Sequence, residues 1–299
     1  MGRVEATVSI ESKDTLRTRI SRRLFGPSKG GGFPFYQPQR PTVFANSMIP
    51  EFLAPFAEQL QRYALPSIKI KATPLRTTGP ASAASKFGGL PYLPLSLSYP
   101  RDGNGKPLLL LAQINLAELP ATDWLPAAGL LQFYVPTHLG CETDESRVLY
   151  LSAAQAGKEM QSDFSFLPAD HYEDSPVYCE HSLTFELTTE YGGTEDARFE
   201  ADFNGLSAHD YEETLPESQK PEFGKLLGGE GHKLGGYAMF TQSDPRAYNS
   251  GTANDVQLLQ IDIDEQIMFG DSGVAHFFIN AQALQNGEFG EAYFYWDCC

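Results

Sequence analysis

Hydrophobic and polar residues alternate along this chain in patterns that are mostly typical of β-strands. Residues 108–114 and 256–263 are apolar at nearly every position, which is typical of strands covered on both faces. Residues 67–73 alternate between apolar and polar side chains, which predicts a strand with one exposed face. Residues 291–296 have the aromatic composition of a further strand.

Two stretches have the spacing of helices. Residues 51–63 follow Pro50 and place Phe52, Phe56 and Leu60 on one face, which predicts a helix. Residues 199–227 are acidic. Their part 211–226 predicts a helix interrupted at Pro216 or Pro221.

Three short blocks of sequence recur in the same order. Residues 86–92 (KFGGLPY) recur as 233–239 (KLGGYAM), and residues 112–115 (AQIN) recur as 259–262 (LQID), both at an offset of 147. Residues 129–135 (GLLQFYV) recur as 273–279 (GVAHFFI) at an offset of 144. Such self-similarity indicates an internal duplication. We expect an α+β fold of mainly antiparallel sheets with a few helices, in which two related halves, about 65–140 and 215–297, pack as one pseudo-symmetric unit.

The first 45 residues differ from the rest of the chain. Residues 14–25 place Leu16, Ile20 and Leu24 four apart among arginines, which predicts a short basic amphipathic helix, and residues 29–41 are a glycine- and proline-rich linker. The helix could lie on an anionic membrane, serve as a transit peptide or pack on the acidic body of the chain. We expect 1–45 to be an appendage to a main domain at 46–299.

The charge of the chain is concentrated in one segment. The sequence has 38 Asp and Glu against 22 Lys and Arg, a net charge of −16, which argues against nucleic acid as the main ligand. Residues 141–230 hold 21 acidic and five basic residues, and we expect them to form an acidic insert between the halves. Such a surface attracts basic proteins, although it also serves solubility alone. We expect no transmembrane segment, and a cytoplasmic location.

The repeated blocks also carry a family resemblance. Together with residues 269–279 (FGDSGVAHFFI) and 295–298 (YWDC), they resemble the YwqG-like family of uncharacterised, mostly bacterial proteins over residues 50–299. Phe269 stands where that family usually has tryptophan, and Ala238 replaces the proline of the first repeat. Genes of the family sometimes lie near secreted-toxin genes. The resemblance therefore implies an immunity-type inhibitor.

Two lysines and three aromatic residues are candidates for a binding groove. Lys86 and Lys233 open the two Gly-Gly blocks, and each either closes its turn by bonding carbonyls or projects into a groove between the halves. Tyr92, Tyr237 and Trp296 would line such a groove, which would take a small ligand or a peptide.

A group of carboxylates is the candidate site for an enzyme. Asp262, Asp264 and Asp271 lie where one predicted strand ends and the next begins. They could bind a cation or serve in catalysis, or they could accept backbone N–H groups in a turn. Ser272, in a Gly-Asp-Ser-Gly run, falls in the turn before a repeated strand, so we do not expect it to be a nucleophile.

The cysteines and histidines match no metal motif. His138, Cys141, Cys179 and His181 are residue types that zinc prefers, but their spacing is not that of a zinc site, and the alternative is ordinary thiols in a reducing compartment. We expect no metal and no cofactor. We therefore predict a non-enzymatic module that binds a basic protein through 141–230, more narrowly an inhibitor of a basic toxin or effector, with an enzyme or a groove binder as alternatives.

Overall fold

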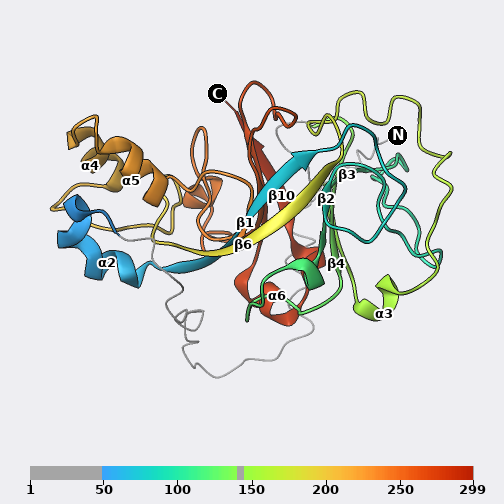
Figure 1. Cartoon of the computed structure of the whole chain (residues 1–299), viewed down its shortest axis with the longest axis horizontal. Helices are drawn as coiled ribbons and strands as arrows, with labels where there is room; N and C mark the ends of the chain where they lie inside the picture. The colour runs from blue at the N-terminus through green and yellow to red at the C-terminus, as the bar shows by residue number, and fades with distance from the viewer. Residues whose placement is uncertain (1–48, 140–144, 299) are drawn as a thin grey trace, which may run out of the picture. The chain divides into compact units, whose positions relative to one another are not determined.

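Within the part of the chain that the structure describes, ten strands form one sheet in which all neighbouring strands run antiparallel (Figure 1). The computed structural model describes residues 49–139 and 145–298, which belong to one compact unit. The predicted helix at 14–25, the linker at 29–41 and Cys141 lie outside the described residues. The order across the sheet is β10-β9-β8-β7-β1-β6-β2-β3-β4-β5. The strands are β1 (Leu65–Pro74), β2 (Lys86–Phe87), β3 (Leu109–Asn115), β4 (Leu130–Val135), β5 (Arg147–Leu151), β6 (His181–Glu190), β7 (Lys233–Gly235), β8 (Val256–Ile261), β9 (Val274–Ile279) and β10 (Tyr293–Asp297).

The helices are few and short beside the antiparallel sheet. The predicted α+β class with a predominantly antiparallel sheet is therefore confirmed. The α-helices are α2 (Ala57–Arg62), α3 (Ala153–Ala156), α4 (Ala208–Thr214), α5 (Lys220–Leu227) and α6 (Ala281–Asn286). The 3₁₀ helices are η1 (Glu51–Phe56), η2 (Leu116–Glu118), η3 (Pro245–Tyr248) and η4 (Phe289–Glu291).

The central pair β1 and β6 separates two arms of the sheet. We call β2–β5 the first arm and β7–β10 the second arm. Lys86 pairs with Gln113 in the first arm and Lys233 pairs with Gln260 in the second, at the same 147-residue offset as the sequence blocks. A register shift also occurs at the same place in each arm, between residues 110 and 112 and between residues 257 and 259.

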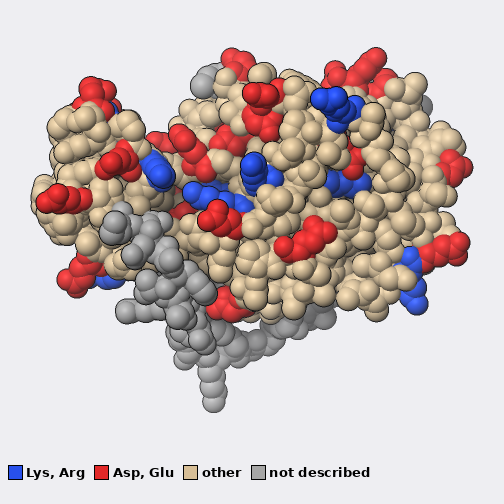
Figure 2. Space-filling model, viewed as in Figure 1, with Lys and Arg blue, Asp and Glu red and all other residues tan. Residues whose placement is uncertain are grey.

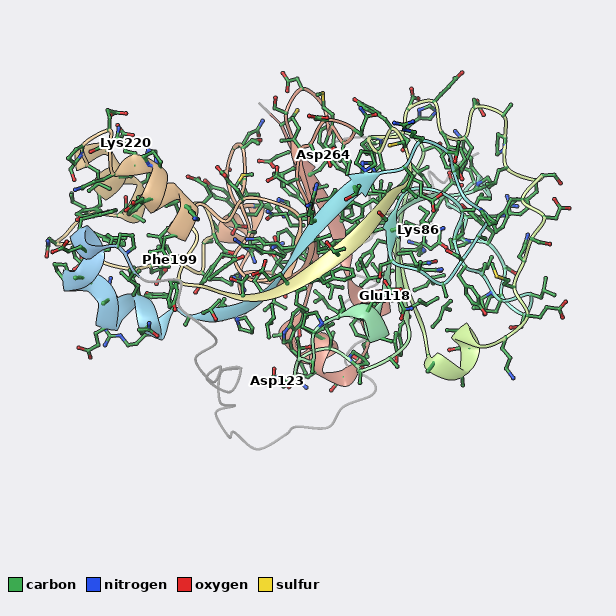
Figure 3. The ribbon with its side chains drawn as sticks, viewed as in Figure 1. Lys86, Glu118, Asp123, Phe199, Lys220 and Asp264 are labelled. Atoms are coloured by element: carbon green, nitrogen blue, oxygen red, sulfur yellow. The ribbon has the colours of Figure 1, made fainter. Side chains whose placement is uncertain are left out.

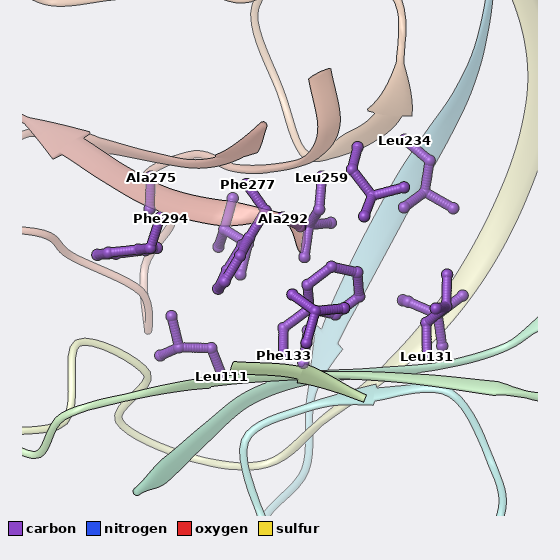
Figure 4. Packing of buried hydrophobic residues seen from close by; sticks show 14 of the residues in the cluster. Leu111, Leu131, Phe133, Leu234, Leu259, Ala275, Phe277, Ala292 and Phe294 are labelled. Atoms are coloured by element: carbon purple, nitrogen blue, oxygen red, sulfur yellow. The ribbon is translucent and has the colours of Figure 1, made fainter. Parts of the chain in front are cut away.

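The main hydrophobic core lies where the two arms face each other (Figure 4). Phe133 of β4 meets Phe277 of β9 with ring centroids 4.9 Å apart. Leu111 and Leu259, from β3 and β8, are fully buried in the same cluster. The apolar runs that predicted these strands are therefore explained, because both faces of β3 and β8 are covered.

A separate hydrophobic cluster holds α2, α4 and α5 together. The cluster fully buries Leu60 of α2, Phe223 of α5, and Phe203, which precedes α4. The predicted helix at 211–226 is in fact two helices, because α4 ends before Pro216. Pro221 does not break α5, since it lies in the first turn, where its missing N–H has no helical partner. The predicted helix at 51–63 begins as 3₁₀ helix η1, which contains Pro55.

The acidic segment 141–230 is not an insert outside the sheet, because it contributes β5 and β6. All ten residues of β6 pair with β1. Leu183 is buried, whereas its neighbours Ser182 and Thr184 are exposed, the alternation of a strand with one covered face. A segment expected to separate the halves therefore lies at the centre of the sheet.

Candidate functional site

The two lysines of the repeated blocks are buried in separate ion pairs. Lys86 Nζ lies 3.3 Å from Glu180 Oε1, and Lys233 Nζ lies 3.0 Å from both carboxylate oxygens of Glu190. Burial lowers the pKa of both lysines, and the neighbouring glutamate opposes that shift in each case. Each lysine thus faces a carboxylate inside the fold rather than an open groove between the halves.

The Gly-Gly turns close over these ion pairs. Gly89 and Gly236 both have positive φ, of 73° and 69°. A Cβ at Gly89 would lie 2.7 Å from the Glu180 carboxylate, and a Cβ at Gly236 would overlap the Glu190 carboxylate. Only glycine satisfies both the backbone angle and the close approach.

Two glutamines tie each turn to its strand. Gln113 Oε1 accepts a hydrogen bond from Tyr92 N at 2.8 Å, and Gln260 Oε1 accepts one from Met239 N at 3.0 Å. Each Nε2 donates to two carbonyls of the segment before the turn, at residues 82 and 84 in the first arm and 229 and 231 in the second. These contacts stabilise the turns and leave the glutamines no role toward a ligand.

The two candidate tyrosines are also buried. The Tyr92 hydroxyl donates to the carbonyl of Lys158, and the Tyr237 hydroxyl donates to the carbonyl of Tyr63 at 2.7 Å. Lys86, Lys233, Tyr92 and Tyr237 are each less than 10% exposed. They therefore stabilise the core, and they do not meet Trp296 in a common site.

Asp262 and Asp264 lie together and act as turn carboxylates. Asp262 accepts hydrogen bonds from the backbone of Ile263 and Gly231, both at 2.7 Å. Asp264 Oδ1 accepts from the backbone of Gln266. This is the turn arrangement that the sequence offered as the alternative to a cation site.

Asp264 lies near the end of β1 (Figure 3). Its remaining oxygen, Oδ2, faces two histidines. His232 Nε2 lies 3.4 Å from Asp264 Oδ2, and His181 Nε2 lies 4.0 Å from it. His232 Nδ1 accepts a hydrogen bond from Asp262 N, so the proton of the neutral ring is on Nε2. Burial lowers the pKa of His232, which favours this neutral form.

Cys179 lies beside this histidine pair, with Sγ 4.0 Å from His181 Nε2. Burial raises the pKa of the Cys179 thiol, so the thiolate that nucleophilic catalysis needs is disfavoured. His138 is elsewhere, 2.8 Å from Asp174. Among residues 49–139 and 145–298, no group of three or more His, Cys, Asp and Glu side chains is arranged to hold a metal ion.

Trp296 lines a cavity of about 410 Å³, and Asp271 is next in sequence to another lining residue, Gly270. We call this cavity the acidic–aromatic pocket, because carboxylates and aromatic rings line it. Its lining residues are His138, Leu139, Glu173, Asp174, Ser175, Pro176, Tyr178, Met268, Phe269, Gly270 and Trp296. Neither Asp262 nor Asp264 belongs to it.

The aromatic wall of the acidic–aromatic pocket is closely packed. Phe269 is buried, and its ring centroid lies 6.4 Å from that of Trp296. Gly270 has a φ of 62°, and a Cβ there would lie 2.7 Å from Cys298 Sγ and 3.1 Å from the Trp296 ring. The turn can therefore lie against the indole only because residue 270 is glycine.

The front of the acidic–aromatic pocket is open to solvent. Tyr178 is 58% exposed, which is unusual for so large a ring. Glu173 and Asp174 are exposed as well, and Asp174 Oδ2 lies 2.8 Å from His138 Nδ1. Sequence reasoning missed Glu173, Asp174 and Tyr178. The run Tyr-Glu-Asp-Ser-Pro-Val-Tyr at 172–178 was the available signal, because it joins aromatic and acidic residues in one short stretch.

Apart from Glu186 on β6, the exposed acids of 145–230 fall in two stretches of the sequence, one before β6 and one after it. β6 runs between them and, at about 3.3 Å per residue, is about 30 Å long. The first acidic region consists of Glu159, Asp163, Asp170, Glu173 and Asp174. The second acidic region consists of Glu200, Asp202, Asp210, Glu213, Glu217, Glu222 and Glu230. Figure 2 shows acidic side chains over the whole viewed face, its middle included, with basic side chains among them.

Comparison with known proteins identifies the family without a function. No curated protein matches the chain. Among the described residues, no helix has both the length and the apolar character needed to cross a bilayer. One family model matches residues 85–298, which include both Gly-Gly turns, both arms and the wall of the acidic–aromatic pocket. The chain therefore belongs to the family described as Domain of unknown function (DUF1963).

Proposed function

We propose that this protein is a non-enzymatic binding module that recognises a basic protein at the acidic–aromatic pocket and along the first acidic region, which shares Glu173 and Asp174 with the pocket. The observation that carries the proposal is the meeting of Glu173 and Asp174 with three aromatic residues at one cavity. Aromatic residues are enriched at the centres of protein interfaces, and charge at the rim steers association.

The charge of this region favours a basic partner. No lysine or arginine is among the residues that line the acidic–aromatic pocket, and the first acidic region adds Glu159, Asp163 and Asp170 nearby in sequence. An exposed acidic surface accelerates association with a positively charged partner and repels nucleic acid.

The geometry supports binding over catalysis. Both carboxylate oxygens of Asp262 accept hydrogen bonds from backbone N–H groups. The two ring nitrogens of His232 contact Asp262 N and the Asp264 carboxylate. Burial also raises the pKa of the Cys179 thiol. Asp262 and His232 are therefore committed to the turn.

A narrower proposal follows from the sequence. An immunity-type inhibitor of a basic toxin or effector is one kind of protein that such a surface would serve, as the resemblance to the YwqG-like family implies. We also propose that the two arms descend from one duplicated unit. This is supported by the equal offsets of the Lys86–Gln113 and Lys233–Gln260 pairs. A cytoplasmic location stays a prediction of the sequence.

The experiment compares two variants of equal charge. Glu159→Gln/Asp163→Asn/Asp170→Asn neutralises three acids of the first acidic region, and Glu200→Gln/Glu222→Gln/Glu230→Gln neutralises three of the second. The tagged wild type should capture a stoichiometric basic protein from its native cells at low salt and release it at high salt. We expect only the first variant to lose that capture.

Two results would contradict the proposal. One is a wild-type protein that captures no basic partner at low salt. The other is an equal loss of capture in both variants, which would show an effect of net charge rather than of a specific surface.

A further inference from the structure

We propose that the acidic–aromatic pocket binds the guanidinium group of an arginine side chain that the partner inserts as its anchor. This inference rests on the proposed function and specifies which chemistry the pocket recognises. It joins a cavity of about 410 Å³, two exposed carboxylates and a wall of aromatic rings.

The size and lining of the pocket suit one long side chain. A guanidinium is planar, so it stacks on an aromatic face while its N–H groups donate to carboxylates. Trp296 and Tyr178 offer the rings, and Glu173 and Asp174 offer the acceptors. An ammonium group uses the same charges but lacks the planar stacking, so we expect arginine to bind more tightly than lysine.

The protein binds its own arginines in this way. The guanidinium of Arg198 lies 5.3 Å from the ring centroid of Tyr237 and donates to both oxygens of Asp196. The guanidinium of Arg246 lies 4.4 Å from the ring of Phe278 and donates to Asp244. Each internal site combines at least one aromatic face with at least one carboxylate, and the acidic–aromatic pocket presents the same combination toward solvent.

His138 lies against one of the two carboxylates of the pocket. Its Nδ1 lies 2.8 Å from Asp174 Oδ2, and both side chains are more than 60% exposed. An exposed pair of this kind contributes little stability, so an incoming guanidinium can displace the imidazole at small cost.

The test uses a blocked amino acid as the probe. The chain has two tryptophans, and Trp124 packs against the core rather than at the pocket. In protein labelled with ¹⁵N at the indole nitrogens, N-acetyl-arginine methylamide should shift the Trp296 resonance saturably and leave Trp124 unchanged. The assignment comes from Trp124→Phe. The citrulline analogue, which is neutral and of the same shape, should cause no saturable shift.

Variants and controls complete the test. Glu173→Gln/Asp174→Asn should raise the Kd of the arginine probe by about tenfold or more, since it removes the charge from both acceptors. Glu200→Gln/Glu222→Gln, with the same change of charge, should leave that Kd unchanged. Equal shifts from the citrulline and arginine probes, or no shift of Trp296, would overturn the arginine site.

The two proposals fail in different ways. If the partner is captured but the arginine probe leaves Trp296 unchanged, the binding function stands and the arginine site is overturned. If the probe binds with the expected charge dependence and no basic protein is captured, the arginine site is supported and the protein-binding function fails.

Discussion

Lys233 Nζ lies 3.0 Å from both carboxylate oxygens of Glu190, and the lysine side chain is entirely buried. The glutamate also accepts the backbone N–H of Tyr237 at 2.8 Å. A charged pair of this kind ties the last residue of β6 to β7 across the intervening strand β1. Substitution of only one of these two residues leaves the other as a buried charge without a partner.

Lys233→Met should therefore lower the free energy of unfolding by about 3–5 kcal/mol, because Glu190 is left uncompensated. Lys225→Met, at an exposed position of α5, should change it by less than about 0.5 kcal/mol. Urea denaturation measures both. If the double variant Lys233→Met/Glu190→Gln regains stability, the uncompensated charge of Glu190 is the cause. An equally small decrease of the free energy of unfolding in both single variants would contradict this explanation.

Gly236→Ala should destabilise the fold more than Gly105→Ala. Both glycines have positive φ, 69° and 82°, so both substitutions carry the same backbone strain of about 1 kcal/mol. Only at Gly236 does the new Cβ meet the Glu190 carboxylate, whereas nothing lies within 4 Å at Gly105. Thermal unfolding should show a clearly larger decrease of Tm for Gly236→Ala. Equal decreases would show that the clash relaxes freely.

Burial holds the pKa of His276 well below its ordinary value, which makes stability depend on pH. The folded state keeps this imidazole neutral, whereas the unfolded state protonates it near pH 6.5. This histidine therefore does not lower the free energy of unfolding above that pH. Below it, the free energy of unfolding decreases as the pH falls toward the pKa of the folded state. The slope is about 1.4 kcal/mol per pH unit for one proton.

His276→Gln places at this position the residue that Gln132 supplies at the corresponding position of the first arm. We expect the free energy of unfolding of the variant to decrease less steeply than that of the wild type between pH 7 and pH 5. Exposed His209→Gln should leave the slope unchanged. If the free energy of unfolding of His276→Gln decreases with pH as steeply as that of the wild type, this histidine does not bind the proton on unfolding.

Cys179 should react slowly with iodoacetamide near pH 7.5. Burial raises the pKa of its thiol, so little thiolate is present. Peptide-level mass spectrometry separates its labelling from that of the other cysteines. Labelling as fast as that of a free thiol in unfolded protein would contradict this, and would reopen a nucleophilic role beside His181.

Much of the sheet could be predicted from the sequence because its strands carry strong local patterns. The apolar runs at 108–114 and 256–263 correspond to β3 and β8, and the alternation at 67–73 corresponds to β1. The strand β6 was missed because Thr184, Glu186 and Thr188 face outward within an acidic stretch, so the charge of the segment concealed its period of two.

The site was harder to predict because burial and long-range pairing decide it. The sequence could not tell whether Lys86 faces solvent, since its partner Glu180 lies 94 residues away. The acidic–aromatic pocket likewise joins residues 138–139, 173–178, 268–270 and 296, which no local pattern connects. Trp296 was identified from sequence, but its neighbours were not.

The position of β1 sets the order in which the chain can fold during synthesis. Both neighbours of β1 come from far downstream, β6 at 181–190 and β7 at 233–235. A nascent chain that ends before residue 181 therefore carries β1 with both edges unpaired, and its first arm has no strand to join. Pairing of the centre must wait until most of the protein has left the ribosome, which makes folding slow and leaves β1 exposed to aggregation in the interval.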